Sequence, residues 1–163
     1  MLLLIEQSLN GLQYGLLLFL LAAGLTLVFG IMDLVNLAHG SLYMMGAYFA
    51  ATFITLTDSF VLGAVLALGA TFLLGVAVEL IAVRTLYARD HLDHVLATFG
   101  LLLFFNELVR LLWGPAGKTI QLPGILNTSV ELLPGLSYPS YRLAVIAVGG
   151  IVAFGLYWLG ARP

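Results

Sequence analysis

QSLNGLQYGLLLFLLAAGLTLVFGIM, the stretch from Gln7 to Met32, contains no charged side chain, and it decides the class of fold. Its 26 residues exceed the ~20 that an α-helix needs to cross the ~30 Å hydrocarbon core of a bilayer. The remainder of the 163-residue chain has the same character, because 62% of all residues are hydrophobic and only 9% are charged. Soluble domains carry roughly 25% charged residues. The sequence therefore predicts an integral membrane protein.

Charged residues divide the rest of the chain into further stretches of spanning length. The intervals that begin after Asp33, Asp58 and Arg142 hold 24, 20 and 19 residues without a charge. We predict an all-α integral membrane protein with about five transmembrane helices. Their expected ranges are Leu9 to Ile31, Ser41 to Thr57, Phe60 to Val83, Val95 to Trp113 and Tyr141 to Ala161.

Two segments between these helices are expected to be loops. Arg84 to His94 is short and densely charged, whereas residues 114–140 hold four of the five prolines. Within the longer loop, Ile120 to Leu126 is apolar enough to pack against the membrane surface or a partner. Because Lys and Arg favour cytoplasmic loops, we place the Arg84 loop in the cytoplasm and the long loop outside, although Lys118 and Arg142 favour the opposite orientation.

Composition excludes several classes of function. With 6 Lys and Arg against 8 Asp and Glu, the chain has no basic stripe for nucleic acid. It has no cysteine, which excludes disulfides, thiolate metal sites and cysteine nucleophiles. It also has no glycine-rich phosphate loop and hence no ATP site of its own. We expect a protein that is not an enzyme.

The sequence around His91 and His94, with Asp90 and Asp93, has the composition of a metal site. Two histidines three residues apart can share a helix face. A catalytic metal site usually needs a third ligand and a shielded pocket, however, and this cluster lies in a charged loop. We therefore expect no metal here and a solvated loop that caps the next helix.

The chemically unusual segment is DLVNLAHGS, Asp33 to Ser41, which interrupts two apolar helices. Polar groups at membrane depth are tolerated only where protein buries them or where they line a wet cavity, and broken helices of this kind form binding sites in transporters. We expect a broken or re-entrant segment near Asp33–Gly40, in which Asn36 caps the incoming helix, His39 forms hydrogen bonds and Gly40 relieves the backbone. A plain interfacial turn requires the same residue types. The residues alone leave both interpretations open.

Glu107 and Arg110 are three residues apart near the end of the fourth predicted helix. Residues at this spacing face each other and can pair. Ionisable side chains cost less near a helix end than at the membrane centre. We expect a structural ion pair at the membrane edge.

Several motifs carry a resemblance to a known family. GLTLVFG, Gly24 to Gly30, followed by NLAHGSLYMMGAY, Asn36 to Tyr48, resembles the N-terminal signature of the branched-chain amino-acid ABC transporter permeases of the LivH type. RDHLDHVLATFG, Arg89 to Gly100, and LLWGP, Leu111 to Pro115, resemble that family's cytoplasmic loop with its next helix and the start of its periplasmic loop. The resemblance covers the chain in order, and Asn-x-Ala-His-Gly is its most specific element.

The resemblance implies a multi-pass subunit of an importer in the bacterial inner membrane, which moves branched-chain amino acids by alternating access. It implies three partners: a second permease subunit, a periplasmic substrate-binding protein and cytoplasmic ABC ATPase subunits that use ATP, with no cofactor in this chain. Carried over by position, Asn36, His39 and Gly40 belong to the break that shapes the translocation path. Tyr43 and Tyr48 lie on the helix that follows.

The resemblance stops short of a complete permease. Residues 1–163 are expected to form a single transmembrane permease domain, the N-terminal part of such a protein, apparently truncated before the ATPase-coupling loop. Two alternatives remain: a truncated or autonomous small membrane protein without transport activity, and the permease of a sibling importer for urea or amides.

Overall fold

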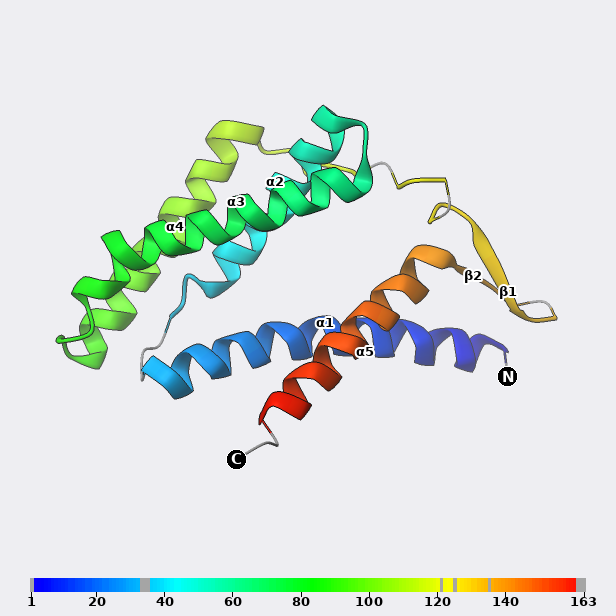
Figure 1. The fold of residues 1–163 in the computed structure, drawn as a ribbon, viewed down its shortest axis with the longest axis horizontal. Helices are drawn as coiled ribbons and strands as arrows, with labels where there is room; N and C mark the ends of the chain where they lie inside the picture. Colours follow the sequence, from blue (N-terminus) through cyan, green and yellow to red (C-terminus); the bar gives the residue numbers. More distant parts are fainter. Residues whose placement is uncertain (1, 33–35, 121, 125, 135, 161–163) are drawn as a thin grey trace. The chain divides into compact units, whose positions relative to one another are not determined.

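The computed structural model describes residues 2–32, 36–120, 122–124, 126–134 and 136–160 (Figure 1). Asp33 to Val35, where the predicted break begins, lie outside the described residues. The chain divides into two compact units, one made of residues 1–24 and 122–163 and the other of residues 25–121.

The predicted helices are present, and each ends within two residues of its expected end, but the first begins seven residues before Leu9 and the fourth begins four residues before Val95. The helices are α1 (Leu2–Met32), α2 (His39–Thr57), α3 (Phe60–Ile81), α4 (His91–Trp113) and α5 (Ser140–Gly160), with a short 3-10 helix η1 (Val83–Thr85) after α3. Within the described residues, four segments, in α1, α3 to η1, α4 and α5, are long and apolar enough to cross a membrane. The prediction of an all-α membrane protein is confirmed in its main part, but the expected five spans become four because α2 is not in this set.

The α2–α3 junction consists of two residues, Asp58 and Ser59, whose types are common at the ends of helices. Asp58 ends α2 in the left-handed conformation, at φ 48°, which aspartate tolerates better than most residues. Ser59 is extended, and its Oγ accepts a hydrogen bond of 3.4 Å from the Leu62 amide as the N-cap of α3. The two helices thus reverse direction within two residues.

In the unit of residues 25–121, α2 packs against α3 and α4 (Figure 1). A cluster of buried side chains lies between these helices: Met45, Val78, Val83, Phe105 and Val109. The closest approach is at Gly63 on α3, where a Cβ would lie 2.6 Å from the backbone nitrogen of Ile54 on α2. Glycine is therefore required at this crossing, as is typical of helix contacts in membranes.

The other unit contains a β-hairpin in a segment that the sequence predicts only as a loop. β1 (Ser129–Leu133) pairs antiparallel with β2 (Leu136–Pro139), and the register shifts between Glu131 and Leu133. Tyr138 on β2 is 1% exposed, and its hydroxyl donates a hydrogen bond of 3.0 Å to Asn10 Oδ1 on α1. Arg142 on α5 donates to the same oxygen. The hairpin is thereby joined to both helices of its unit.

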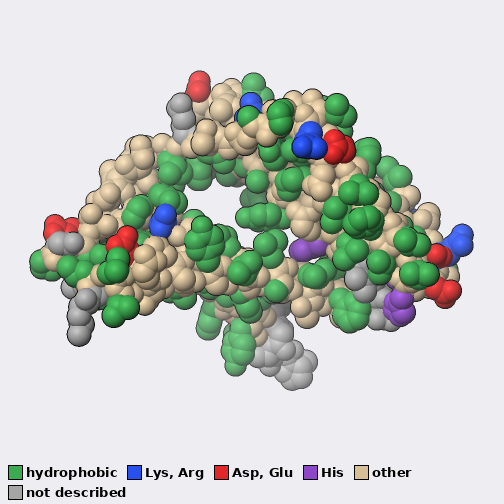
Figure 2. All heavy atoms as spheres, turned by 180° about the vertical axis from the view of Figure 1, so that it is seen from behind, with side chains coloured by type: hydrophobic (Ala, Val, Ile, Leu, Met, Phe, Trp, Pro, Cys, Tyr) green, Lys and Arg blue, Asp and Glu red, His purple; other side chains and the backbone are tan. Residues whose placement is uncertain are grey.

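The helices leave large apolar side chains exposed. Leu111 is 81% exposed and Ile81 is 78% exposed, with many similar residues on all the long helices. Hydrophobic side chains predominate on the face shown in Figure 2, where charged side chains are scattered. Such surfaces are stable only when lipid or protein covers them. With four spanning segments, the chain is a multi-pass membrane protein.

Candidate functional site

The entry to α2 is organised by Asn36. Its side chain is buried, and Oδ1 accepts a hydrogen bond of 3.0 Å from the Ala38 amide. Its backbone carbonyl accepts a bond of 3.3 Å from the His39 amide. An asparagine that bonds the backbone two residues later forms an Asx turn. These contacts of Asn36 lie at the start of α2, and the cap predicted for the incoming helix stays a prediction, because Asp33 to Val35 lie outside the described residues.

His39 and Gly40 form the first turn of α2. His39 is half-buried and Gly40 is exposed. A Cβ added at Gly40 would meet no atom within 4 Å. The predicted role of Gly40, relief of the backbone at the break, stays a prediction, because Asp33 to Val35 lie outside the described residues. Ser41, the next residue, is buried.

The two tyrosines of the predicted path lie on different sides of α2. At about 100° per residue, positions 43 and 48 are separated by about 140° around a helix axis. Tyr43 is 55% exposed, whereas Tyr48 is half-buried, with its ring centroid 5.2 Å from that of Trp113. The structure therefore does not bring these two side chains together.

Tyr48 belongs to an aromatic cluster at the end of α4. Phe49 also contacts Trp113, with ring centroids 6.1 Å apart. The indole Nε1 of Trp113 donates a hydrogen bond of 2.7 Å to Thr52 Oγ1 on α2. The sequence indicates no role for Trp113 beyond its place in the family motif, because nothing local reveals a contact to a residue so distant in the chain.

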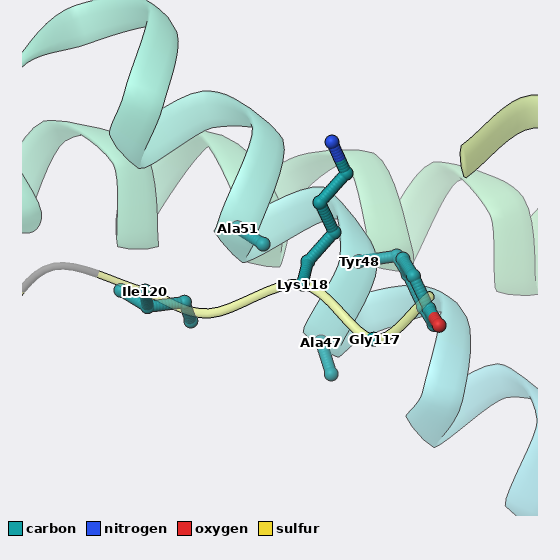
Figure 3. Close-up of a pocket in the computed structure, with 6 residues that line it drawn as sticks. All are labelled: Ala47, Tyr48, Ala51, Gly117, Lys118 and Ile120. Carbon is teal, nitrogen blue, oxygen red and sulfur yellow. The ribbon is translucent and has the colours of Figure 1, made fainter. Parts of the chain in front are cut away.

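A recess lies beside this cluster, between α2 and the segment 117–120 (Figure 3). Its volume is about 210 Å³. The lining residues are Ala47, Tyr48, Ala51, Gly117, Lys118 and Ile120. Ile120 was expected to pack against the membrane surface or a partner, and here it lines a cavity with α2 of its own unit.

Glu107 and Arg110 form an ion pair on α4, with Arg110 Nη1 3.3 Å from Glu107 Oε1. Their side chains are 67% and 66% exposed. An exposed pair three residues apart stabilises a helix by only about 0.2–0.5 kcal/mol in water.

His91 and His94 approach each other with ring centroids 5.7 Å apart. Among the described residues, no group of three or more His, Cys, Asp or Glu side chains is arranged to hold a metal ion. His94 is buried instead of solvated, and its Nε2 lies 2.7 Å from the Leu86 carbonyl oxygen. It therefore ties the start of α4 to the loop that follows η1.

The same loop is also held to α3, by a different side chain. The Tyr87 hydroxyl donates a hydrogen bond to Glu79 Oε1. This bond to the carboxylate, with a smaller contribution from burial, raises the pKa of Tyr87 to about 12. The bonds from Tyr87 to Glu79 and between His94 and Leu86 thus help to fix the connection between α3 and α4.

Comparison with known proteins shows the family to which this chain belongs. Residues 7–159 match the model of the family described as branched-chain amino acid transport system / permease component. Because the match spans nearly the whole chain, the protein belongs to this family, and the resemblance drawn from the sequence motifs is confirmed. No solved structure is significantly similar to the chain.

Individual relatives carry the corresponding names. The high-affinity branched-chain amino acid transport system permease protein BraD of Pseudomonas aeruginosa is 31% identical over 163 aligned residues, which cover 93% of this chain and 53% of BraD. The LivH permease proteins of Salmonella typhimurium and Escherichia coli K12 are 29% and 28% identical, over 76% of this chain and 42% of each relative. The chain spans about half the length of these curated relatives.

Proposed function

We propose that the chain forms part of the translocation path for branched-chain amino acids, as a permease subunit of an ABC importer in the bacterial inner membrane. The observation that carries this proposal is the family match over residues 7–159. The names of BraD and LivH supply the solute class. Four spanning segments are consistent with a path through a bilayer.

Within this path we assign the entry of α2 to the solute-facing surface. Asn36, His39 and Gly40 place polar groups between apolar helices, and Asn36 is held by its bond to the Ala38 amide. Tyr43 and Tyr48 lie on different sides of α2, so we assign them to separate parts of the path, with Tyr48 beside Trp113. The residues offer hydrogen bonds and shape, so the solute is moved without being chemically changed.

The energy for transport is supplied by partners. The sequence has no glycine-rich phosphate loop, and we assign ATP use to cytoplasmic ABC ATPase subunits. A second permease subunit completes the path, and a periplasmic binding protein delivers the solute to the side that carries residues 114–140. Alternating access between the two sides then gives uptake.

Co-purification tests this assignment. A complete permease that contains this chain, tagged and extracted from bacterial membranes in which its partners are expressed, should carry an ABC ATPase subunit that mass spectrometry identifies. ATP-dependent uptake of labelled leucine into proteoliposomes of the assembly, with urea and acetamide as competing solutes, tests the solute class. A permease that is purified without an ATPase subunit contradicts the importer assignment, and uptake of urea but not leucine contradicts the solute.

A further inference from the structure

The recess between α2 and residues 117–120 has the size of a site for a small solute. Its volume of about 210 Å³ is below the roughly 300–1,000 Å³ of pockets that hold drug-sized ligands. All six lining residues belong to the unit of residues 25–121.

Small side chains on α2 create the recess. Ala47 and Ala51 are four residues apart, so their methyl groups lie on one face of the helix, one turn from each other. Figure 3 shows the segment 117–120 passing across this face, with Ile120 and the stem of Lys118 beside the two alanines. The floor and walls are therefore mainly aliphatic.

One wall of the recess is held in place before any ligand arrives. The Tyr48 ring packs against Trp113, whose indole nitrogen is bonded to Thr52 at 2.7 Å. A preformed wall reduces the ordering cost of binding. A small aliphatic group can enter without repacking α2.

Charge determines the orientation of a ligand. Lys118 is the charged residue among those that line the recess, and within the described part of the chain it forms no ion pair. In Figure 3 its ammonium and the Tyr48 hydroxyl point in opposite directions, so one cation stands at one side of an otherwise apolar space. An ammonium group favours an anionic partner within a few ångströms.

We propose that this recess binds the aliphatic side chain of a small carboxylate-bearing solute, whose carboxylate pairs with Lys118. The proposal rests on the proposed function, and it adds a location and an orientation for the solute. A lipid acyl chain is the competing occupant, because it fits the aliphatic walls but makes no use of the cation unless it ends in a carboxylate.

Trp113 provides a readout, because its ring contacts the wall of the recess and the chain has only one other tryptophan. The whole chain carrying Trp158→Phe, in nanodiscs of zwitterionic lipid, is titrated with L-leucine while indole fluorescence is recorded. We expect a saturable change with L-leucine and with 4-methylpentanoate, which keeps the carboxylate. Leucinol, which lacks the carboxylate, and glycine, which lacks the aliphatic group, should bind at least about tenfold more weakly.

Matched variants test the two halves of the site. Lys118→Met should weaken binding of L-leucine about tenfold, and Lys118→Arg should restore most of it. Ala47 is exposed, so Ala47→Leu should fold and fill the recess, which abolishes the fluorescence change. Ala22→Leu makes the same change at an exposed helical alanine outside the recess and should leave binding intact.

Several results would overturn the site. Leucinol binding as tightly as L-leucine contradicts the role of Lys118, and unchanged binding in Ala47→Leu contradicts the location. The proposal is contradicted if L-leucine causes no change in indole fluorescence. It is also contradicted if a neutral lipid alone reverses the fluorescence change that L-leucine causes. L-leucine binding that survives both Lys118→Met and Ala47→Leu removes this site but leaves the importer assignment standing, since ATPase co-purification does not depend on Lys118.

Discussion

Trp113 and Thr52 are joined by a hydrogen bond of 2.7 Å between residues 61 positions apart in the chain. The bond connects the end of α4 to the C-terminal half of α2, at the point where the chain leaves α4 for the segment that forms the recess. Because the Tyr48 ring packs on the same indole, the position of Trp113 affects both helix packing and the candidate site.

Replacing Trp113 with Phe should keep aromatic contact and remove the hydrogen bond. We expect a loss of about 1 kcal/mol in the free energy of unfolding, measured by thermal unfolding in detergent. Thr52→Val removes the same bond and also the bond of 2.8 Å from the Thr52 hydroxyl to the Tyr48 carbonyl. Because both variants lose the Trp113–Thr52 bond, the loss in the double variant should be smaller than the sum of the two single losses. Thr55→Val is the control, since its hydroxyl bonds only carbonyls of its own helix. If the losses of the two single variants simply add in the double variant, Trp113 and Thr52 do not stabilise the protein through a common bond.

Gly63→Ala should force α2 and α3 apart. The new Cβ would lie 2.6 Å from Ile54 Cγ1 and equally close to the Ile54 backbone nitrogen, and backbone cannot move aside as a flexible side chain does. We expect a loss of about 1–3 kcal/mol, again from thermal unfolding. Gly69→Ala and Gly75→Ala on the same helix meet no atom within 4 Å and should be neutral or stabilising. Equal effects at all three glycines would contradict the proposed close crossing.

Alkaline pH should loosen the loop between α3 and α4. The folded-state pKa of Tyr87 is raised to about 12 by its bond to Glu79, above its ordinary value of about 10. The stabilisation is therefore complete below about pH 10 and is lost as the pH rises towards 12. Ultraviolet titration of tyrosinate, compared between the native chain and Tyr87→Phe, should show one late-titrating tyrosine that the variant lacks. An ordinary midpoint for that tyrosine would contradict the hydrogen bond.

Asn10→Leu should destabilise the unit that contains the hairpin. Tyr138, 1% exposed, would keep its hydroxyl without the Asn10 acceptor, which costs about 1–3 kcal/mol. Tyr138→Phe removes the hydroxyl donor and, with it, the need for an acceptor, so this variant should lose less stability. Limited proteolysis within residues 122–139 measures the effect, with faster cleavage expected for Asn10→Leu. Cleavage as fast in Tyr138→Phe, which keeps the ring and has no hydroxyl to satisfy, would contradict the assignment of the loss to an unpaired Tyr138 hydroxyl.

Changes at the entry of α2 should affect transport more than folding. In a complete permease that contains this chain, Asn36→Leu should reduce leucine uptake roughly fivefold or more, as expected when a hydrogen bond worth about 1 kcal/mol is lost. His39→Leu, which removes the imidazole assigned to the path, should also reduce uptake. Membrane insertion should be unchanged. Asn36→Asp, which keeps an acceptor for the Ala38 amide, serves as the conservative control. Normal uptake by both leucine variants would remove the role assigned to this turn.

The helices could be predicted because their ends coincide with local chemical signals. The α2–α3 junction falls at Asp58–Ser59, and α4 ends before Gly114, whose φ is 83°. The start of α4 was predicted four residues late, because the charged residues around His91 and His94 were read as solvated loop. In the structure His94 is buried against the Leu86 carbonyl, a contact that no local pattern encodes.

The hairpin and the recess could not be predicted in the same way. The Pro134-Gly135 dipeptide is a turn signal, but the flanking segments are short, and β2 is held by Asn10 at the other end of the sequence. The recess joins Ala47 to Lys118 through the packing of Trp113 on Tyr48. Long-range contacts of this kind depend on tertiary packing, which neither hydropathy nor spacing reports.

The modest apolarity of α2 has a consequence for biogenesis. As the nascent chain leaves the ribosome, a segment must gain enough free energy from lipid to leave the translocon on its own, and α2 is not among the segments apolar enough to do so. Its Asp58–Ser59 connection to α3 and the tight contact at Gly63 make a helical pair whose second member is strongly apolar. We therefore expect α2 to integrate stably only once α3 has been synthesised and can pair with it.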